Sequence, residues 1–307
     1  GLDLAGFTGH GVTSVRDLGG YVARLKAAQD GATVGPAIYS TYSTLNGKAF
    51  APFQRAVTTE AELRSAVGDM VEAGAIQIKI HRAFPAALLP AAVRIAREHD
   101  LAVTGHIPLG LHPLRACEAG MAGIEHLGSF LEAYISVTAG ATADDAIAYM
   151  LSGSAETLYR CLVSRRVAVT PTLVVYPAVA RERGKGVSST DAAKFIDGVS
   201  RIAGRLHRAG VPLLAGTDTS DVGGLAMPPG ASLLDELETL QAAGVPPRDV
   251  IAIATVNAAR TLGLEAKTGT ITPGKAADFV LLDADPGADI GNARELAAVY
   301  RVGKRVD

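Results

Sequence analysis

Short runs of β-prone apolar residues alternate with longer amphipathic runs along most of the chain. The apolar runs predict strands at residues 12–15, 37–41, 76–80, 102–104, 124, 167–173 and 212–215. The amphipathic runs predict helices at residues 60–73, 85–99, 144–165, 190–209, 233–243 and 247–262. Strands that alternate with helices in this way are typical of βα units built around a parallel sheet.

The number of predicted strands bears on the kind of fold. Seven of them precede residue 218, whereas a closed (β/α)8 barrel has eight. We therefore expect an α/β fold over residues 1–265, a TIM-like (β/α)8 barrel whose first strand is missing from this chain. The tail, residues 266–307, predicts strands near residue 270, at 279–282 and at 299–302. It is expected to form the C-terminal part of a small β-sandwich.

Composition fits this architecture and narrows the class of function. The chain has 307 residues, of which 48% are hydrophobic and 20% charged, and a single barrel takes about 250 residues. The formal net charge is -2, which does not favour a nucleic-acid partner. No apolar run approaches the ~18 residues of a membrane span. We expect a small-molecule substrate, with neither nucleic acid nor membrane as a partner.

Four further expectations concern the cysteines and the surroundings of the chain. Cys117 and Cys161 are too few for a disulfide framework and lie among apolar neighbours, so buried free thiols are expected. Residues 1–7 contain no Met and read as the interior of a helix, so natural sequence is expected upstream. A cytoplasmic location is favoured. A barrel that lacks one strand would expose edges, which invites pairing into a homo-oligomer.

Four residues able to bind a metal or move a proton stand at the ends of predicted strands. They are Lys79, His106, His126 and Asp218. The C-terminal ends of barrel strands converge on one face, where barrel enzymes place their chemistry, so these side chains can meet in space. Neutral imidazole is the commonest metal ligand. Two histidines at consecutive strand ends, after a strand that carries the lysine, therefore favour a metal site.

Each of these residues also has a plainer explanation. Gln77, Lys79 and His81 alternate with isoleucines, so Lys79 is expected to face the barrel interior. A buried charge needs a partner, and Lys79 could pair with Asp218 instead of serving a metal. A single histidine at a strand end is often a hydrogen-bonded core residue. Asp218 could simply cap the helix that follows it.

Longer segments around these residues resemble known sequences. Residues 11–20 read Gly-Val-Thr-Ser-Val-Arg-Asp-Leu-Gly-Gly, residues 215–218 Ala-Gly-Thr-Asp, residues 255–260 Thr-Val-Asn-Ala-Ala-Arg, and residues 269–278 Gly-Thr-Ile-Thr-Pro-Gly-Lys-Ala-Ala-Asp. In these motifs the whole chain resembles the amidohydrolase superfamily, in particular its imidazolonepropionase-like and prolidase-like members. The resemblance implies a metal-dependent hydrolase of an amide, peptide-like or cyclic C–N bond that uses a metal-activated water.

The resemblance also implies roles for the four candidates. Lys79 matches a lysine that is carboxylated by CO2 and bridges two divalent ions, in the first place Zn²⁺. His106 and His126 match metal ligands, and Asp218 matches a metal ligand that is also the catalytic general base. The family's first-strand His-X-His pair is absent, because His10 precedes the second strand. One or two ions and weak turnover by this chain are therefore expected.

Residues beside the predicted strand ends are candidates for substrate contact. His81 and Arg82 directly follow the strand of Lys79, and Tyr42 and Tyr176 lie in loops after strands. Specificity is expected in the loops at residues 42–53, 176–189 and 219–232. Two alternatives stay open. One is an esterase, lactonase or phosphotriesterase on the same metal centre. The other is a non-catalytic binding or scaffold protein that has lost the first-strand ligands.

Overall fold

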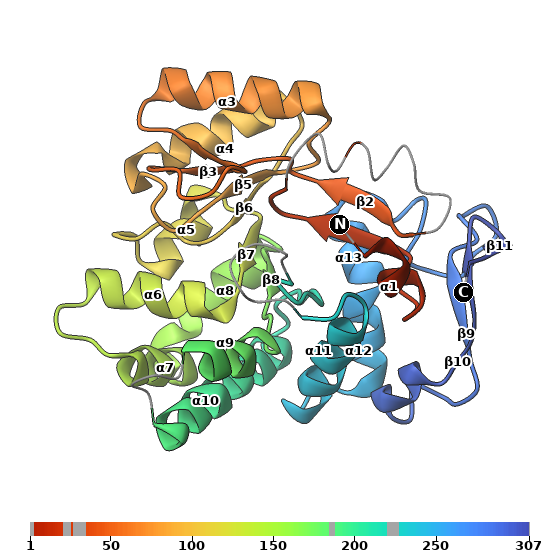
Figure 1. The fold of residues 1–307 in the computed structure, drawn as a ribbon. Coiled ribbons are helices and arrows are strands. Elements are labelled where there is room, and N and C mark those ends of the chain that lie inside the picture. The colour runs from red at the N-terminus through yellow and green to blue at the C-terminus, as the bar shows by residue number, and fades with distance from the viewer. Residues whose placement is uncertain (1–2, 21–25, 27–34, 184–187, 220–226, 307) are drawn as a thin grey trace.

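The architecture combines a row of parallel strands with a covering of helices and an antiparallel sheet in the tail (Figure 1). The structure is a computed structural model that describes residues 3–20, 26, 35–183, 188–219 and 227–306. Two of the predicted specificity loops, at residues 176–189 and 219–232, lie partly outside the described residues.

The parallel strands follow one another in chain order with one exception. They are β1 (Ser14–Asp17), β2 (Ala37–Ser40), β3 (Thr44–Asn46), β4 (Gln54–Ala56), β5 (Ile78–Ile80), β6 (Val103–Gly105), β7 (Gly123–Glu125) and β8 (Ala168–Thr170). The exception is β4, which lies beside β3 on the side away from β5. Backbone hydrogen bonds from Ile76 to Ser40 (3.1 Å) and from Ala122 to Val103 (2.8 Å) continue the row between the ladders. A bridge from Val169 to Leu213 extends it beyond β8. Apart from the position of β4, this parallel order is the one predicted for barrel strands.

The predicted strand list was wrong in three places. β3 and β4 were missed, so the count of parallel strands was too low. β3 is only three residues long and follows β2 after a short irregular stretch, so periodicity gives little signal for it. Residues 212–215 contribute a single bridge at Leu213 rather than a strand. Thr270 is not in a strand, and its hydroxyl instead hydrogen-bonds within a turn to Thr272 and Lys275.

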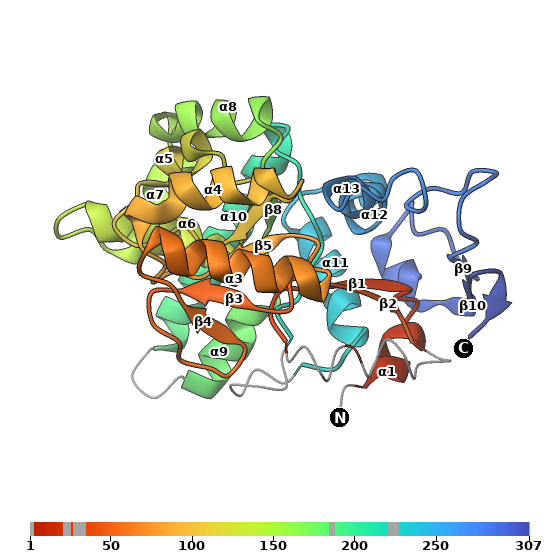
Figure 2. The ribbon, with the colours of Figure 1, turned by 90° about the horizontal axis from the view of Figure 1, so that it is seen from above.

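The helices surround the strands (Figures 1 and 2). They are α1 (Leu4–Thr8), α3 (Glu60–Ala73), α4 (Leu89–Glu98), α5 (Pro113–Ala119), α6 (Leu127–Val137), α7 (Ala143–Leu151), α8 (Glu156–Ser164), α9 (Val175–Arg183), α10 (Ser189–Arg208), α11 (Ala231–Ala242), α12 (Pro247–Ala254) and α13 (Val256–Thr261). None of the described helices has the length and apolarity that crossing a bilayer requires.

Two helix predictions show how local chemistry decides the outcome. α3 has the predicted bounds because Thr59 and Glu62 form a reciprocal capping box and Gly74 ends the helix at φ 92°. The single helix predicted at residues 144–165 is two helices, α7 and α8. Ser152 breaks it with an extended backbone, and its hydroxyl accepts the backbone N–H of Ser154.

The core lies between the strand row and the helices. Ile78 and Ile80 of β5 are fully buried among Leu63, Ile95 and other apolar side chains. Successive residues of a strand point to opposite faces, so Lys79 points to the face of the strand row opposite this core. The packing of β5 thus fixes the direction of the first candidate site residue.

The expectation of free thiols was wrong. Cys117 of α5 and Cys161 of α8 form a disulfide with their Cα atoms 6.3 Å apart. The two cysteines are 44 residues apart in sequence. Their proximity depends on α5 and α8 lying side by side in the helix layer, and no local pattern could reveal it.

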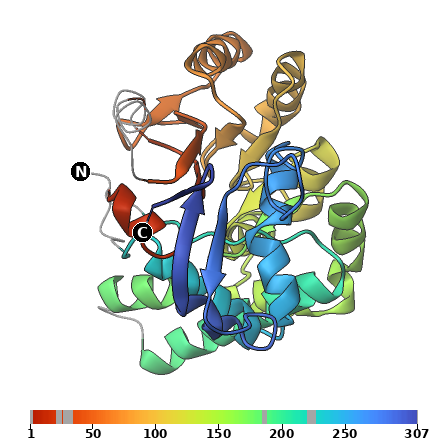
Figure 3. The same ribbon diagram turned by 90° about the vertical axis from the view of Figure 1, so that its right-hand side faces the viewer.

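The tail forms a separate antiparallel sheet, seen face-on in Figure 3. β9 (Phe279–Leu282), β10 (Leu296–Arg301) and β11 (Lys304–Arg305) lie in the order β11-β10-β9. The rings of Phe279 and Tyr300 stack with centroids 4.7 Å apart across this sheet. The predicted antiparallel element is confirmed here, while the boundary at residue 265 stays a prediction.

Candidate active site

The four candidate residues come together beyond the carboxyl ends of the strands. Lys79 lies in β5, His106 directly follows β6, and His126 directly follows β7. The ring centroids of His106 and His126 are 4.9 Å apart. Oδ1 of Asp218, a few residues beyond the Leu213 bridge, lies 3.7 Å from Nε2 of His126. Residues that are 139 positions apart in the chain (79 to 218) therefore share one site.

Glycines allow the strands to approach closely at this site. Gly105 has φ 131°, and a Cβ atom there would lie 2.1 Å from the carbonyl oxygen of Ile80. The same carbonyl accepts the backbone N–H of His106 at 3.0 Å, so only glycine permits the hydrogen bond that places this histidine. Gly216 plays a similar part, since a Cβ there would lie 2.5 Å from Cγ2 of Thr170.

Two of the four residues at the strand ends have an unusual backbone. His126 has φ 63° and Asp218 has φ 53°, in the left-handed region that side chains other than glycine seldom adopt. Such conformations are energetically costly and concentrate at functional sites. The strain falls on the two residues whose side chains face each other.

A hydrogen bond fixes the tautomer of His126. The hydroxyl of Thr172 donates to the carbonyl of Pro171 at 2.8 Å, so its oxygen is left to accept. Nδ1 of His126 lies 3.0 Å from that oxygen, and because the hydroxyl proton points to Pro171 we assign Nδ1 as the donor. The lone pair of the neutral ring is therefore on Nε2, which faces Asp218. Second contacts of this kind orient histidines that bind metals.

The other two rings are also held neutral. Burial, followed by the neighbouring Lys79, lowers the pKa of His106 well below its usual value. Nδ1 of His106 is buried and has no hydrogen-bond partner among the described residues. The ring of His81 lies 4.3 Å from that of His106, and burial lowers its pKa to about 4. An unprotonated, unpartnered ring nitrogen is suited to a metal ion.

Lys79 is 5% exposed, and its ammonium forms no ion pair with a described residue. Burial lowers its pKa, and Arg16 acts in the same direction, whereas Glu125 and Asp218 oppose the shift. The plainer explanation, an ion pair between Lys79 and Asp218, is therefore not what the described residues form. A lowered pKa favours the neutral amine, which is the form that can react with CO2.

The unmodified side chains alone do not make a metal site. Within the described residues, no group of three or more His, Cys, Asp or Glu side chains could hold a metal ion. Carboxylation of Lys79 would add an anionic oxygen beside His106 and His126. The donor set then fits a divalent ion, because the buried Nδ1 of His106 has no hydrogen-bond partner among the described residues and Nε2 of His126 faces Asp218, itself a possible ligand.

Sequence reasoning missed a buried polar network next to Lys79. Arg16 of β1 forms an ion pair with Glu125 of β7 at 2.8 Å and donates to Thr170 of β8 at 3.0 Å. Thr104 of β6 donates to Glu125 at 2.6 Å. Burial would raise the pKa of Glu125, but Arg16, Lys79 and these hydroxyls outweigh it and lower the pKa to about 2. The signal for this network in the sequence was the presence of Arg16 and Glu125, two charged residues, within short β-prone segments.

The remaining candidates occupy different surroundings. Arg82 forms an ion pair with Glu132 at 3.3 Å, and both side chains are about half exposed. Tyr42 is 7% exposed and belongs to the hydrophobic core. The hydroxyl of Tyr176 accepts the backbone N–H of Gly128 at 2.7 Å, at the start of the helix that follows His126. His81 is the one of the four that lies against the histidine pair.

The sequence and the fold match known proteins. The sequence profile described as the amidohydrolase family matches residues 4–306. A 5-methylthioadenosine/S-adenosylhomocysteine deaminase of Symbiobacterium thermophilum is 35% identical over 116 residues, which are 35% of this chain and 26% of that protein. That match thus spans about a quarter of the relative.

Solved structures agree over nearly the full chain. A putative prolidase from Bifidobacterium longum is 26% identical, with a TM-score of 0.71, and the match covers 99% of this chain and 74% of that one. The ochratoxinase of A. niger is 23% identical, with a TM-score of 0.74 and coverage of 96% and 72%. The second likeness concerns the fold alone.

Proposed function

The chain belongs to the amidohydrolase family, and on that premise we propose that it is a metal-dependent hydrolase of a C–N bond. The bond would be an amide, a peptide-like bond or a cyclic C–N bond in a small molecule. The prolidase-like and deaminase-like relatives both act at such bonds, which supports this choice. The observation that carries the proposal is the meeting of His106, His126 and Asp218 beside the buried Lys79.

The proposed ligands of one divalent ion are carboxylated Lys79, His106 and His126. Zn²⁺ is the proposed ion, since imidazole nitrogen and carboxylate-type oxygen are ligands that it accepts in open catalytic sites. When bound, the ion would lower the pKa of a water ligand toward 7 and polarise the scissile carbonyl. Asp218 faces His126 and is the proposed further ligand. The sequence contains no His-X-His pair, so weak turnover by this chain stays a prediction.

Asp218 is the proposed general base. Its side chain is 47% exposed, so water and substrate can reach it, while His126 beside it is only 14% exposed. It would accept a proton from the attacking water and deliver it to the departing nitrogen. The neutral ring of His126 cannot compete for that proton through Nδ1, because this nitrogen already donates to Thr172.

Substrate contact is proposed first for His81, whose neutral ring lies against that of His106 and could hydrogen-bond a carbonyl or carboxylate. Arg82 could clamp a carboxylate only by leaving Glu132. The hydroxyl of Tyr176 already accepts the backbone N–H of Gly128. Tyr42 would have to leave the hydrophobic core to contact a substrate. These three stay weaker proposals than His81.

The test is a substrate panel with matched variants. The chain, supplied with Zn²⁺ and bicarbonate, is assayed on dipeptides, N-acyl amino acids, a lactone and a phosphotriester. C–N cleavage that is lost in Asp218→Asn and His106→Asn but kept in His112→Asn supports the proposal. His112 is a suitable control because its ring caps α5 through Leu114, away from the histidine cluster. Turnover of the lactone or phosphotriester alone would favour the ester-cleaving alternative. No metal-dependent turnover of any substrate would favour the scaffold.

A further inference from the structure

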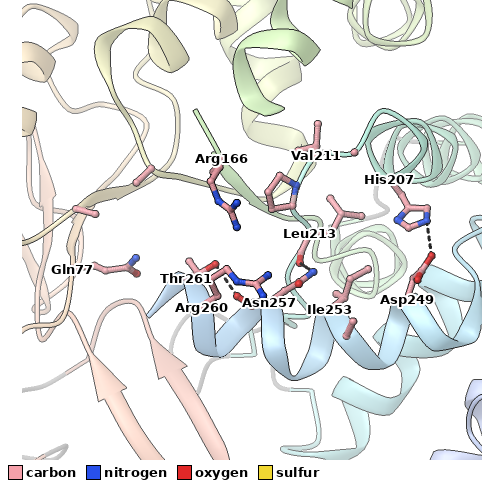
Figure 4. A pocket seen from close by; sticks show the side chains of 15 residues that line it. Gln77, Arg166, His207, Val211, Leu213, Asp249, Ile253, Asn257, Arg260 and Thr261 are labelled. Carbon is pink, nitrogen blue, oxygen red and sulfur yellow. Dashed lines mark hydrogen bonds and ion pairs between the residues drawn. The ribbon is translucent and has the colours of Figure 1, made fainter. Parts of the chain in front are cut away.

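A cavity of about 560 Å³ lies at the amino end of the strand row, the end opposite His106 and His126 (Figure 4). Gln77, Ala102 and Ala122 form one wall, and each immediately precedes a parallel strand. Helices α12 and α13 form the facing wall. Its volume falls within the ~300–1,000 Å³ of small-molecule sites.

Two arginines give this cavity a positive charge. Arg166, at the turn before β8, and Arg260 of α13 extend their side chains into it from opposite walls. Neither guanidinium forms an ion pair with a described residue. The other ionisable side chains of the lining, His207 and Asp249, lie 3.2 Å from each other (Nε2 to Oδ2) at the far end. Within the described part of the lining, Arg166 and Arg260 are therefore the charged side chains that lie without an ion-pair partner.

The rest of the lining supplies an apolar surface and the side-chain amide of Asn257. Val211, Leu213 and Ile253 contribute apolar side chains. The amide of Asn257 donates to the backbone carbonyl of Leu213 at 3.3 Å and so links α13 to the segment that lies beside β8. The cavity is open to solvent on the side of the exposed Arg166 and Arg260, and it thus has a cationic part beside an apolar part.

We propose that this cavity is a binding site for a small organic anion, separate from the proposed active site. A carboxylate or phosphate group would lie between Arg166 and Arg260, and its apolar body would pack against Val211 and Ile253. Guanidinium groups present several N–H donors in a planar fork that matches the oxygens of either group. The site does not depend on a metal or on Lys79, so it stands whether or not the chain is a C–N hydrolase.

Isothermal titration of the full 307-residue chain tests the site with three probes. Phenyl phosphate and benzoate carry the anion on an apolar ring, and benzyl alcohol is the neutral comparison. Both anions should bind and benzyl alcohol should not. The anion that binds more tightly shows whether the site prefers a phosphate or a carboxylate group. Equal binding of benzyl alcohol, or no binding of either anion, would overturn the proposal.

Variants locate the anion. Arg166→Ala and Arg260→Ala should each weaken binding at least about tenfold, because each removes a charge-assisted contact. Arg165→Ala removes the exposed neighbour that does not line the cavity and should bind as the wild type does. Arg166→Lys keeps the positive charge but loses the planar guanidinium. Its affinity for the anion should therefore lie between those of the wild type and Arg166→Ala, which distinguishes a local loss of contact from misfolding. Unchanged affinity in both alanine variants would place the anion elsewhere and contradict the assignment.

Discussion

Nδ1 of His126 donates to Oγ1 of Thr172 across 3.0 Å, and this contact leaves Nε2 of the ring free toward the site. The partner is a threonine at the end of the next strand rather than the carboxylate that often fulfils this role. The contact therefore joins the ends of β7 and β8 as well as choosing the tautomer.

The first prediction concerns this contact. Thr172→Val keeps the shape of the side chain but removes the acceptor, so Nδ1 of His126 loses its partner. Zinc affinity should fall about 10–100-fold, as expected when a second-layer partner of a ligand is removed. Competition titration with a zinc chelator measures it. Thr157→Val on the exposed face of α8 is the control, and equal affinity in both variants would contradict the role of Thr172.

Much of the fold followed from local patterns, and the failures have physical causes. The bounds of α3 were predictable because Thr59, Glu62 and Gly74 are all within the helix or beside it. The break at Ser152 was not, because a serine hydroxyl can either cap a turn or face solvent. β3 and β4 were missed because three residues give no usable period.

The candidate site divides in the same way. Lys79, His106, His126 and Asp218 could be chosen because each follows or interrupts an apolar run. Thr172 and Arg16 could not, because their partners are 46 and 109 residues away in sequence. The disulfide between Cys117 and Cys161 was missed for the same reason. Long-range contacts decide these roles, and a single sequence does not contain them.

The second prediction concerns the buried pair of Arg16 and Glu125. Arg16→Met leaves the Glu125 carboxylate buried without its partner, and the free energy of unfolding should fall by about 3–5 kcal/mol. Arg64→Met is the control, since its pair with Glu98 is about half exposed and solvent screening should leave it with little effect on stability. Urea unfolding measures both. A loss in Arg16→Met no larger than in the control would show that the network does not stabilise the barrel.

The pH dependence of the same pair has a definite sign. The folded pKa of Glu125 is lowered to about 2 from an ordinary value of 4.5. Its contribution to stability is therefore present above pH 4.5 and is lost as the pH falls through 2. Glu125→Gln should lack this acid-dependent loss. An identical acid slope in wild type and Glu125→Gln would contradict the lowered pKa.

The third prediction concerns Glu236 of α11, which has the opposite shift. Burial raises its pKa to about 7, although backbone N–H groups that include Val174 (2.9 Å) oppose the shift. The unfolded chain ionises near pH 4.5 while the folded chain stays protonated, so stability should fall as the pH rises from about 4.5 to 7. The fall should be up to about 3 kcal/mol. Glu236→Gln should flatten the curve over this range, and a slope equal to that of the wild type would count against the prediction.

The fourth prediction concerns the disulfide. A crosslink between residues 44 apart should stabilise the chain by about 4 kcal/mol through the entropy of the unfolded state. Reductant should therefore lower the Tm of the wild type and leave the Cys117→Ser/Cys161→Ser variant unchanged. Thiol titration after denaturation without reductant should find no free thiol, and two free thiols would contradict the pairing. An intact pair would also argue against the favoured cytoplasmic location, because disulfides persist in oxidising compartments.

Zinc content is the most direct test of the proposed metal centre. The chain is dialysed against Zn²⁺ and bicarbonate, freed of loose ions, and measured by inductively coupled plasma mass spectrometry. About one ion per chain is expected for the wild type and for His112→Asn, as for a three-ligand catalytic site. Lys79→Ala and His106→Asn should each retain almost none. Equal zinc in all four proteins, or none in the wild type, would contradict the assignment of Lys79, His106 and His126 as metal ligands.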